Sequence, residues 1–187
     1  MAGLIEALRE MRWTAMKITQ FGHGVCSANG EPCDCETADH TIAISEERGE
    51  SGTDSGRYLA AGAVRSLWVR TRQGQLVEAM PRIRKELERA ENTFVESNSI
   101  LRFLKPDLYL SVLDPAVSDF KDSARRYLDR ADAVLVPEGS ELRPGLWQGV
   151  SGSLYGRSRV ITMRPPQYVT QELIEFVRDR VNADAAV

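Results

Sequence analysis

The sequence lacks any apolar run that approaches the roughly 18 residues a membrane-spanning helix needs. Its first residues also lack the succession of basic, apolar and small residues that marks a signal peptide. The formal net charge is -3 over 187 residues, and the two signs are interspersed, so there is no basic stripe of the kind that binds nucleic acid. We therefore expect a cytoplasmic protein whose partners include neither a membrane nor a nucleic acid.

Cysteine and histidine are absent from most of the chain and occur only in residues 23–40, HGVCSANGEPCDCETADH. The side chains concerned are His23, Cys26, Cys33, Cys35 and His40. Gly24, Gly30 and Pro32 lie among them and favour a loop. Because thiols stay reduced in the cytoplasm, an odd number of clustered cysteines favours metal or redox chemistry over a disulfide framework.

Thiolate and imidazole ligands of this number suit tetrahedral Zn²⁺. We therefore expect a structural zinc site, in which either His40 or His23 is the fourth ligand beside the three cysteines, because four protein ligands close the coordination shell. The spacing C-x6-C-x-C-x4-H matches no common zinc-finger pattern, so redox-active thiols and solvated, reduced cysteines of no special role are the alternatives. Residues 20–52 are interpreted as an inserted loop that is metal-binding at first and then acidic and flexible.

Short apolar runs alternate with amphipathic segments along the rest of the chain. Strands are predicted for residues 13–19, 41–45, 64–70, 93–96, 108–113, 133–136 and 160–163. Helices are predicted for residues 2–11, 75–90 and 97–104. Three more are predicted from a cap at Thr53 or Asp54 to residue 61, from a cap at residue 118 or 119 to residue 131, and from a cap at Thr170 onward. This alternation predicts a single α/β domain, residues 1–187, with three layers: a mostly parallel sheet and helices on both of its faces.

Four segments follow one another in an order that is informative. They are LIEALRE with TAMKIT (residues 4–10 and 14–19), TDSGRYLAAGA (53–63), FVESNS (94–99) and ADAVLV (131–136). Together they resemble the MobB-like P-loop GTPase family, the GTP-binding adaptors of molybdenum-cofactor biosynthesis. The resemblance implies a P-loop NTPase-like fold, GTP and Mg²⁺ as ligands, and a homodimer or a protein partner.

The resemblance is incomplete at its most important point. The family's Gly-x-x-x-x-Gly-Lys-Ser/Thr should precede the first helix, yet this sequence begins inside that helix and has no such motif downstream. That motif supplies the backbone N–H groups and the lysine that hold the phosphates, so we expect poor nucleotide binding. The first, central strand is missing as well, which predicts a gap in the sheet with unpaired edges. A start codon placed too far downstream and a degenerate relative both account for this.

Charged residues at predicted strand ends form the candidate nucleotide site. Lys17 is predicted to end the second strand of the family's sheet, Glu96 ends another strand, and Asp54 and Arg57 lie in the segment TDSGRYLAAGA. Ligands of open parallel sheets gather beyond the carboxyl ends of strands, so these residues are candidates for phosphate and Mg²⁺. Surface charge at loop ends is the alternative interpretation.

No Ser-His-Asp or Cys-His nucleophile arrangement can be defended, so no catalytic residue is predicted. The sequence thus predicts a GTP-binding protein that resembles the MobB adaptor and binds its nucleotide poorly. A non-enzymatic interaction module, stabilised by zinc and built on a degenerate P-loop NTPase fold, is the alternative. A thiol redox protein is the third interpretation.

Overall fold

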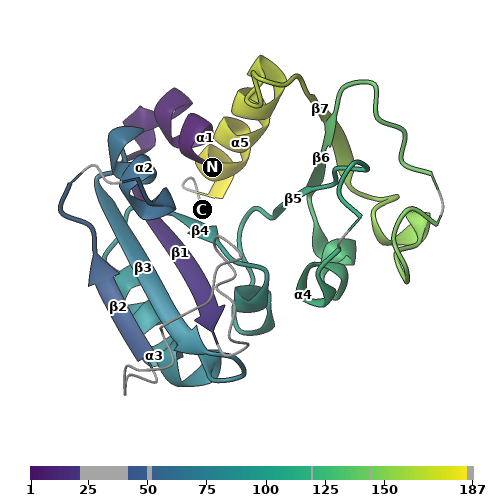
Figure 1. Cartoon of the computed structure of the whole chain (residues 1–187). Coiled ribbons are helices and arrows are strands. Elements are labelled where there is room, and N and C mark those ends of the chain that lie inside the picture. The colour runs from purple at the N-terminus through teal and green to yellow at the C-terminus, as the bar shows by residue number, and fades with distance from the viewer. Residues whose placement is uncertain (22–41, 50–51, 119, 144, 185–187) are drawn as a thin grey trace. The chain divides into compact units, whose positions relative to one another are not determined.

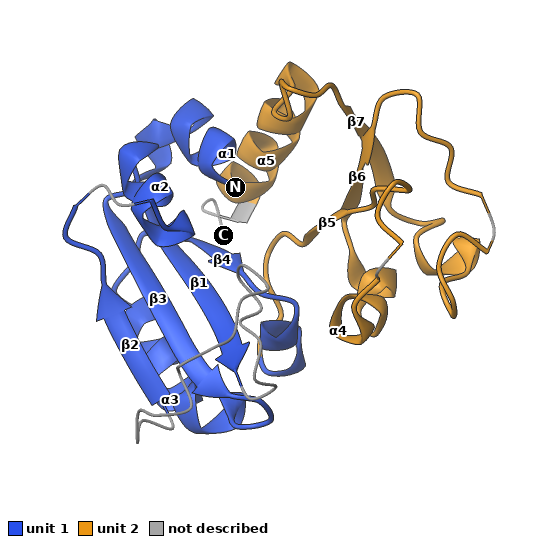
Figure 2. Cartoon of the chain, viewed as in Figure 1, with its two compact units in different colours: residues 1–103 blue, residues 104–187 orange. Residues whose placement is uncertain are grey.

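The computed structural model describes residues 1–21, 42–49, 52–118, 120–143 and 145–184 (Figure 1). The chain divides into two compact units, residues 1–103 and residues 104–187 (Figure 2). Each unit has its own sheet and its own set of buried apolar side chains. Most of the predicted insert at residues 20–52 lies outside the described residues.

Unit 1 is built on a four-stranded sheet in the order β2-β3-β1-β4. The strands are β1 (Trp13–Phe21), β2 (Ile42–Glu46), β3 (Arg65–Arg72) and β4 (Asn92–Glu96). β1 runs parallel to both β3 and β4, and β2 is antiparallel to β3. The gap that we expected in the sheet is not present among these four strands, because β1 itself is paired along both of its edges.

Helices α2 (Asp54–Ala60) and α3 (Leu76–Leu87) lie against opposite faces of this sheet (Figure 1). Arg65 on β3 donates to Glu86 on α3 at 3.0 Å, so its side chain is on the α3 face. Successive side chains of a strand alternate between faces, which puts Trp68, three positions later, on the α2 face. Trp68 pairs with Lys17 of β1, so Lys17 is also on the α2 face.

The predicted helix at residues 2–11 is divided into α1 (Ala2–Ala7) and a 3-10 turn, η1 (Arg9–Met11). The division falls at Leu8, whose carbonyl accepts hydrogen bonds from the Met11 N–H at 3.1 Å and from Trp13 Nε1 at 2.7 Å. These bonds satisfy a carbonyl that would otherwise be left open at a helix end. The chain then turns into β1 through Arg12, which has a left-handed conformation with φ of 52°.

The core of unit 1 lies on both faces of the sheet. The consecutive residues Ala15 and Met16 of β1 are both fully buried, which requires cover on each side. Ile83 of α3 and Ile5 of α1 are likewise fully buried. The prediction of a mixed α/β fold with a mostly parallel sheet is therefore confirmed at this level.

Unit 2 contains a second, wholly parallel sheet in the order β5-β6-β7. Its strands are β5 (Leu110–Val112), β6 (Ala133–Pro137) and β7 (Arg159–Met163), and its short helical segments are α4 (Asp122–Arg125), η4 (Leu128–Arg130) and η5 (Gly152–Leu154). In unit 1 the segment after β4 is also a 3-10 turn, η3 (Ser99–Arg102). Leu113, Val134 and Ile161 are fully buried in the core of unit 2.

The helix predicted from residue 118 or 119 to residue 131 is wrong in its extent. Only Asp122–Arg125 is α-helical, and the chain continues through a non-helical Tyr127 into the 3-10 turn η4. Leu128 is nevertheless fully buried, because a 3-10 turn and an α-helix both bring residues three apart to one side. The helix was predicted from the apolar spacing of Phe120, Ala124, Tyr127, Leu128 and Ala131, of which the last three are buried and the first two half-buried. The spacing therefore predicted most of the buried side but not the pattern of hydrogen bonds.

The last helix, α5 (Gln171–Asp184), begins where it was predicted. The Leu173 N–H donates to Thr170 Oγ1 at 3.4 Å, as expected of a capping threonine. Leu173 and Val177 are 1% exposed and form its buried side. None of the helices that the structure describes is both long enough and apolar enough to cross a bilayer.

Candidate functional site

The four residues predicted for nucleotide and Mg²⁺ converge on the α2 face of unit 1. Lys17 lies in the middle of β1, not at its end, because the strand continues to Phe21. Its partner on β4 is Glu96, so the two side chains stand beside each other on one face of the sheet. Asp54 and Arg57 come from α2, which covers that face.

Lys17 forms ion pairs with both carboxylates. Its Nζ donates to Asp54 Oδ2 and lies 3.6 Å from Glu96 Oε1. The remaining Asp54 oxygen, Oδ1, lies 3.2 Å from Nη2 of Arg57. The Lys17 side chain is only 15% exposed, whereas that of Arg57 is 64% exposed. The lysine is therefore an internal part of the group, and the arginine is at its solvent edge.

Tyr58 is a fifth member of this group, which was not predicted from the sequence. Its hydroxyl donates a hydrogen bond to Glu96 Oε2, and the residue is 5% exposed. Burial, and then Glu96, raise the pKa of Tyr58, so the phenol stays protonated and acts as a donor. Because residues four apart share a face of a helix, its spacing from Asp54 in α2 was a usable signal. We call Lys17, Asp54, Arg57, Tyr58 and Glu96 the Lys17 cluster.

Helix α2 is positioned for this role by its first turn. The Gly56 N–H donates to Thr53 Oγ1 at 3.1 Å, which makes Thr53 the predicted N-cap. Glu47, just beyond β2, accepts from the Ser55 hydroxyl at 2.7 Å and from Thr53 at 3.2 Å. These contacts attach a helix of only seven residues to the sheet, and such a helix is not stable without tertiary contacts.

The charges of the cluster largely cancel. The hydrogen bond from Lys17 is the largest cause that holds the pKa of Asp54 below its usual value, and burial opposes it. Burial is the largest influence on the amino group of Met1 and lowers its pKa, whereas the negative charges of Glu96 and Asp54 oppose this shift. Carboxylate oxygens are ligands that suit Mg²⁺, so Asp54 and Glu96 fit that ion chemically. In this arrangement, however, the Lys17 ammonium is already paired with both, and Arg57 balances the second negative charge.

We expect the Lys17–Asp54 pair to contribute stability that is lost in acid. Because the pKa of Asp54 in the folded state lies below its unfolded value, the contribution is complete above about pH 4 and is lost as the pH falls through the folded pKa. The Asp54 side chain is 35% exposed, so solvent screening limits the loss to about 1 kcal/mol. Urea unfolding of the wild-type chain and of Asp54→Asn at a series of pH values tests this. The difference between their free energies of unfolding should shrink below about pH 4; a difference that stays constant would contradict the ion-pair explanation.

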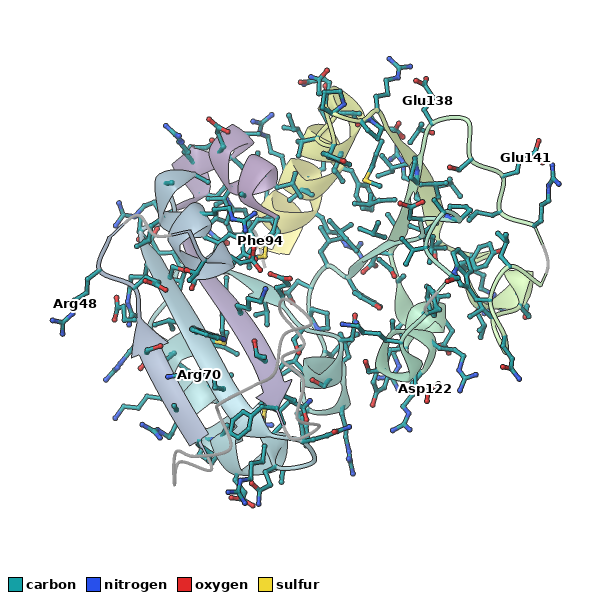
Figure 3. The ribbon with its side chains drawn as sticks, in the orientation of Figure 1. Arg48, Arg70, Phe94, Asp122, Glu138 and Glu141 are labelled. Carbon is teal, nitrogen blue, oxygen red and sulfur yellow. The ribbon has the colours of Figure 1, made fainter. Side chains whose placement is uncertain are left out.

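An aromatic residue borders the cluster on the side of β3. Trp68 pairs with Lys17 in the sheet, and its Nε1 donates to Thr19 Oγ1 at 3.0 Å. The guanidinium of Arg70, a residue labelled in Figure 3, lies over the Trp68 ring, 4.7 Å from its centroid. The α2 face of the sheet thus carries cationic and hydrogen-bonding side chains on β1 and β3, which suit an anionic ligand.

The five predicted zinc ligands, His23, Cys26, Cys33, Cys35 and His40, all lie outside the described residues. Among the residues that are described, no group of three or more His, Cys, Asp or Glu side chains could hold a metal ion. The zinc site therefore stays a prediction from the sequence.

A scan against models of protein families, a search of curated proteins and a search of solved structures each found no match to this chain.

Proposed function

We propose that unit 1 binds the phosphates of a nucleotide, GTP by its resemblance to MobB-like proteins, together with Mg²⁺ at the Lys17 cluster. The observation that carries this proposal is the convergence of Lys17, Asp54 and Glu96 from β1, α2 and β4. These residues are distant in the sequence, and each was predicted separately as a ligand of the same site. Contact among all three is not expected by chance, so it supports the proposal. The P-loop NTPase-like arrangement of three layers belongs to the same proposal.

Each side chain has a role that follows from its chemistry. Lys17 and Arg57 donate to phosphate oxygens, the lysine as a point charge and the arginine from the solvent edge. Asp54 and Glu96 accept the Mg²⁺ ion, directly or through water. Tyr58 holds the Glu96 carboxylate through its hydroxyl. Bound Mg²⁺ would neutralise phosphate charge.

The affinity is expected to be low. The sequence contains no Gly-x-x-x-x-Gly-Lys-Ser/Thr, so it lacks the loop whose backbone N–H groups surround the phosphates in P-loop proteins. Side chains alone must then hold the ligand, and we expect a Kd weaker than about 0.1 mM. The proposal is accordingly one of nucleotide binding, in the manner of an adaptor, and does not include hydrolysis.

One feature of the cluster favours the alternative, a non-enzymatic interaction module. Lys17 and Arg57 together balance the charges of the two carboxylates from within the chain, so the cluster is also a sufficient means of attaching α2 to β1 and β4 without any ligand. In that case the predicted zinc loop would be the functional element, and unit 1 would only support it.

Nucleotide titration separates the two functions. We expect GTP to bind the wild-type chain only in the presence of Mg²⁺, and Glu96→Gln to weaken that binding by about tenfold, since a hydrogen bond to a charged group is worth about 1.5–3 kcal/mol. Glu91→Gln is the matched control, because Glu91 is an exposed carboxylate near β4 that pairs with Arg12 at 2.8 Å, outside the cluster. Binding can be followed by NMR shifts of backbone amides in β1 and α2.

Two results would count against the proposal in different ways. Micromolar, Mg²⁺-dependent binding would contradict the expected loss of affinity. No saturable binding at about 10 mM GTP, or equal binding by Glu96→Gln and wild type, would remove the nucleotide function and leave the interaction module.

A further inference from the structure

We propose that the Lys17 ammonium holds the place of the divalent cation while no phosphate is bound, and that phosphate opens the cation site by drawing Lys17 away. Lys17 then competes with the divalent cation for the two carboxylates, and this competition couples cation binding to phosphate binding. This inference rests on the proposed function for its phosphate half. Its cation half stands on the geometry of the cluster alone.

The two carboxylates converge on one ammonium group. Asp54 Oδ2 accepts from Lys17 Nζ, and Glu96 Oε1 lies 3.6 Å from the same nitrogen. The other oxygen of each carboxylate is held in place by a separate partner, Arg57 for Asp54 and Tyr58 for Glu96. The two carboxylates thus keep one oxygen each for a shared cation, and Lys17 is the cation that they share.

A divalent ion and the ammonium cannot use these two oxygens together. Mg²⁺ binds oxygen at about 2.0–2.1 Å, so an ion that bridges both carboxylates would lie within a few ångströms of Nζ. At about 4 Å, two like charges repel each other even in a partly solvated setting; the Lys17 side chain is 15% exposed, and those of Asp54 and Glu96 are 35% and 46% exposed. A cation alone must therefore displace the lysine, which then loses its partners.

The movement that this requires is confined to one side chain. The backbone of Lys17 is fixed by the pairing of β1 with β3 on one edge and with β4 on the other. The lysine stem has four rotatable carbons and its ammonium has three donors, so it can turn from the carboxylates to a nearby anion without any change in the sheet. The oxygens of a bound phosphate would replace the two carboxylates as negatively charged partners of Lys17.

Coupling of this kind is reciprocal. Phosphate raises the affinity for the cation by the same factor by which the cation raises the affinity for phosphate. Removal of the lysine charge should abolish that coupling. It should also raise the affinity for the cation alone, because the competitor is gone.

The test measures binding of Mn²⁺ alone, without phosphate, by electron paramagnetic resonance of the free ion. We expect Lys17→Met to bind Mn²⁺ about tenfold tighter than the wild type, a modest value for loss of one charge at about 4 Å in a partly solvated site. Lys85→Met is the matched control: it removes the same charge from an exposed position on α3, at the other face of the sheet, and should bind like the wild type. Adding Asp54→Asn to Lys17→Met should cancel the gain.

Equal Mn²⁺ affinity of wild type and a folded Lys17→Met, or an equal gain in Lys85→Met, would overturn the inference. If Lys17→Met does not fold, the Nζ resonance of Lys17 in the ¹⁵N spectrum of the wild-type chain decides instead. That resonance should move during a Mg²⁺ titration while that of Lys85 does not, and a Lys17 signal that stays fixed would also overturn the inference.

The outcome is independent of the proposed function. If Lys17→Met binds Mn²⁺ more tightly and the wild type does not bind GTP, Lys17 occupies a cation site but the proposed nucleotide binding is wrong. If the wild type binds GTP and Lys17→Met does not gain affinity for Mn²⁺, the nucleotide binding is supported and the competition between Lys17 and the cation is wrong.

Discussion

Replacement of Trp13 by alanine is expected to lower the free energy of unfolding by about 3–5 kcal/mol, the range for removal of a buried large aromatic side chain. Trp13 is 3% exposed, and its ring centroid lies 4.4 Å from that of Phe94 on β4. Its Nε1 also donates to the Leu8 carbonyl at 2.7 Å. One side chain at the start of β1 therefore connects this strand to β4 and to the segment after α1.

Trp13→Phe separates the packing of the ring from its hydrogen bond. The Leu8 carbonyl also accepts from the Met11 N–H at 3.1 Å, so loss of the indole donor leaves no unpaired carbonyl. We therefore expect Trp13→Phe to cost only about 1–2 kcal/mol. Urea unfolding followed by circular dichroism measures both variants. A loss below about 1 kcal/mol for Trp13→Ala would show that this contact does not support the sheet.

The elements of unit 1 that were predicted correctly have strong local signals. The run TAMKIT is apolar enough to be recognised as a buried strand, and Thr53 is a capping residue placed directly before a helix. The helix at α3 was predicted from an apolar stripe of Leu76, Met80, Ile83 and Leu87, of which the first three are buried and Leu87 is half-buried. These signals depend on neighbours in the sequence, so they survive without knowledge of the fold.

What was not predicted depends on pairing between distant strands. The extension of β1 to Phe21 follows from its register with β3, in which Phe21 faces Arg72, and no local pattern contains that information. The position of Lys17 within the strand follows from the same register. The inner position of β1, between β3 and β4, was likewise not predicted, because the order of strands is set by contacts between distant segments.

The candidate site shows the same division. Lys17, Asp54, Arg57 and Glu96 were selected by resemblance and by strand ends, yet the sequence does not determine that Lys17 pairs with both carboxylates. That contact requires the β1–β4 register and the placement of α2 over one face of the sheet. The ion pairs change the expected binding properties of the site, because the carboxylates that were predicted to bind a metal cation are already paired with the Lys17 ammonium.

Unit 2 has a comparable anchor in Trp147, which no sequence pattern assigned to a role. The residue is 4% exposed in the long connection between β6 and β7. Its Nε1 donates to the Val117 carbonyl at 2.7 Å, and its ring centroid lies 5.1 Å from that of Phe120. The connection has other contacts too, since Arg125 donates to the Gln148 carbonyl at 3.3 Å and Val150 is buried.

We expect Trp147→Ala to lower the free energy of unfolding by about 3–5 kcal/mol, for the same reason of a large buried ring. Trp147→Phe should retain the contact with Phe120 and lose the bond to Val117, at a cost of about 0.5–1.5 kcal/mol, because Val117 is exposed and its carbonyl can bond to water instead. Urea unfolding gives the free energies, and limited proteolysis should reveal new cleavage within residues 138–158 of Trp147→Ala. If Trp147→Ala unfolds at the wild-type urea concentration and resists protease equally, the connection is held by other contacts and Trp147 is not its anchor.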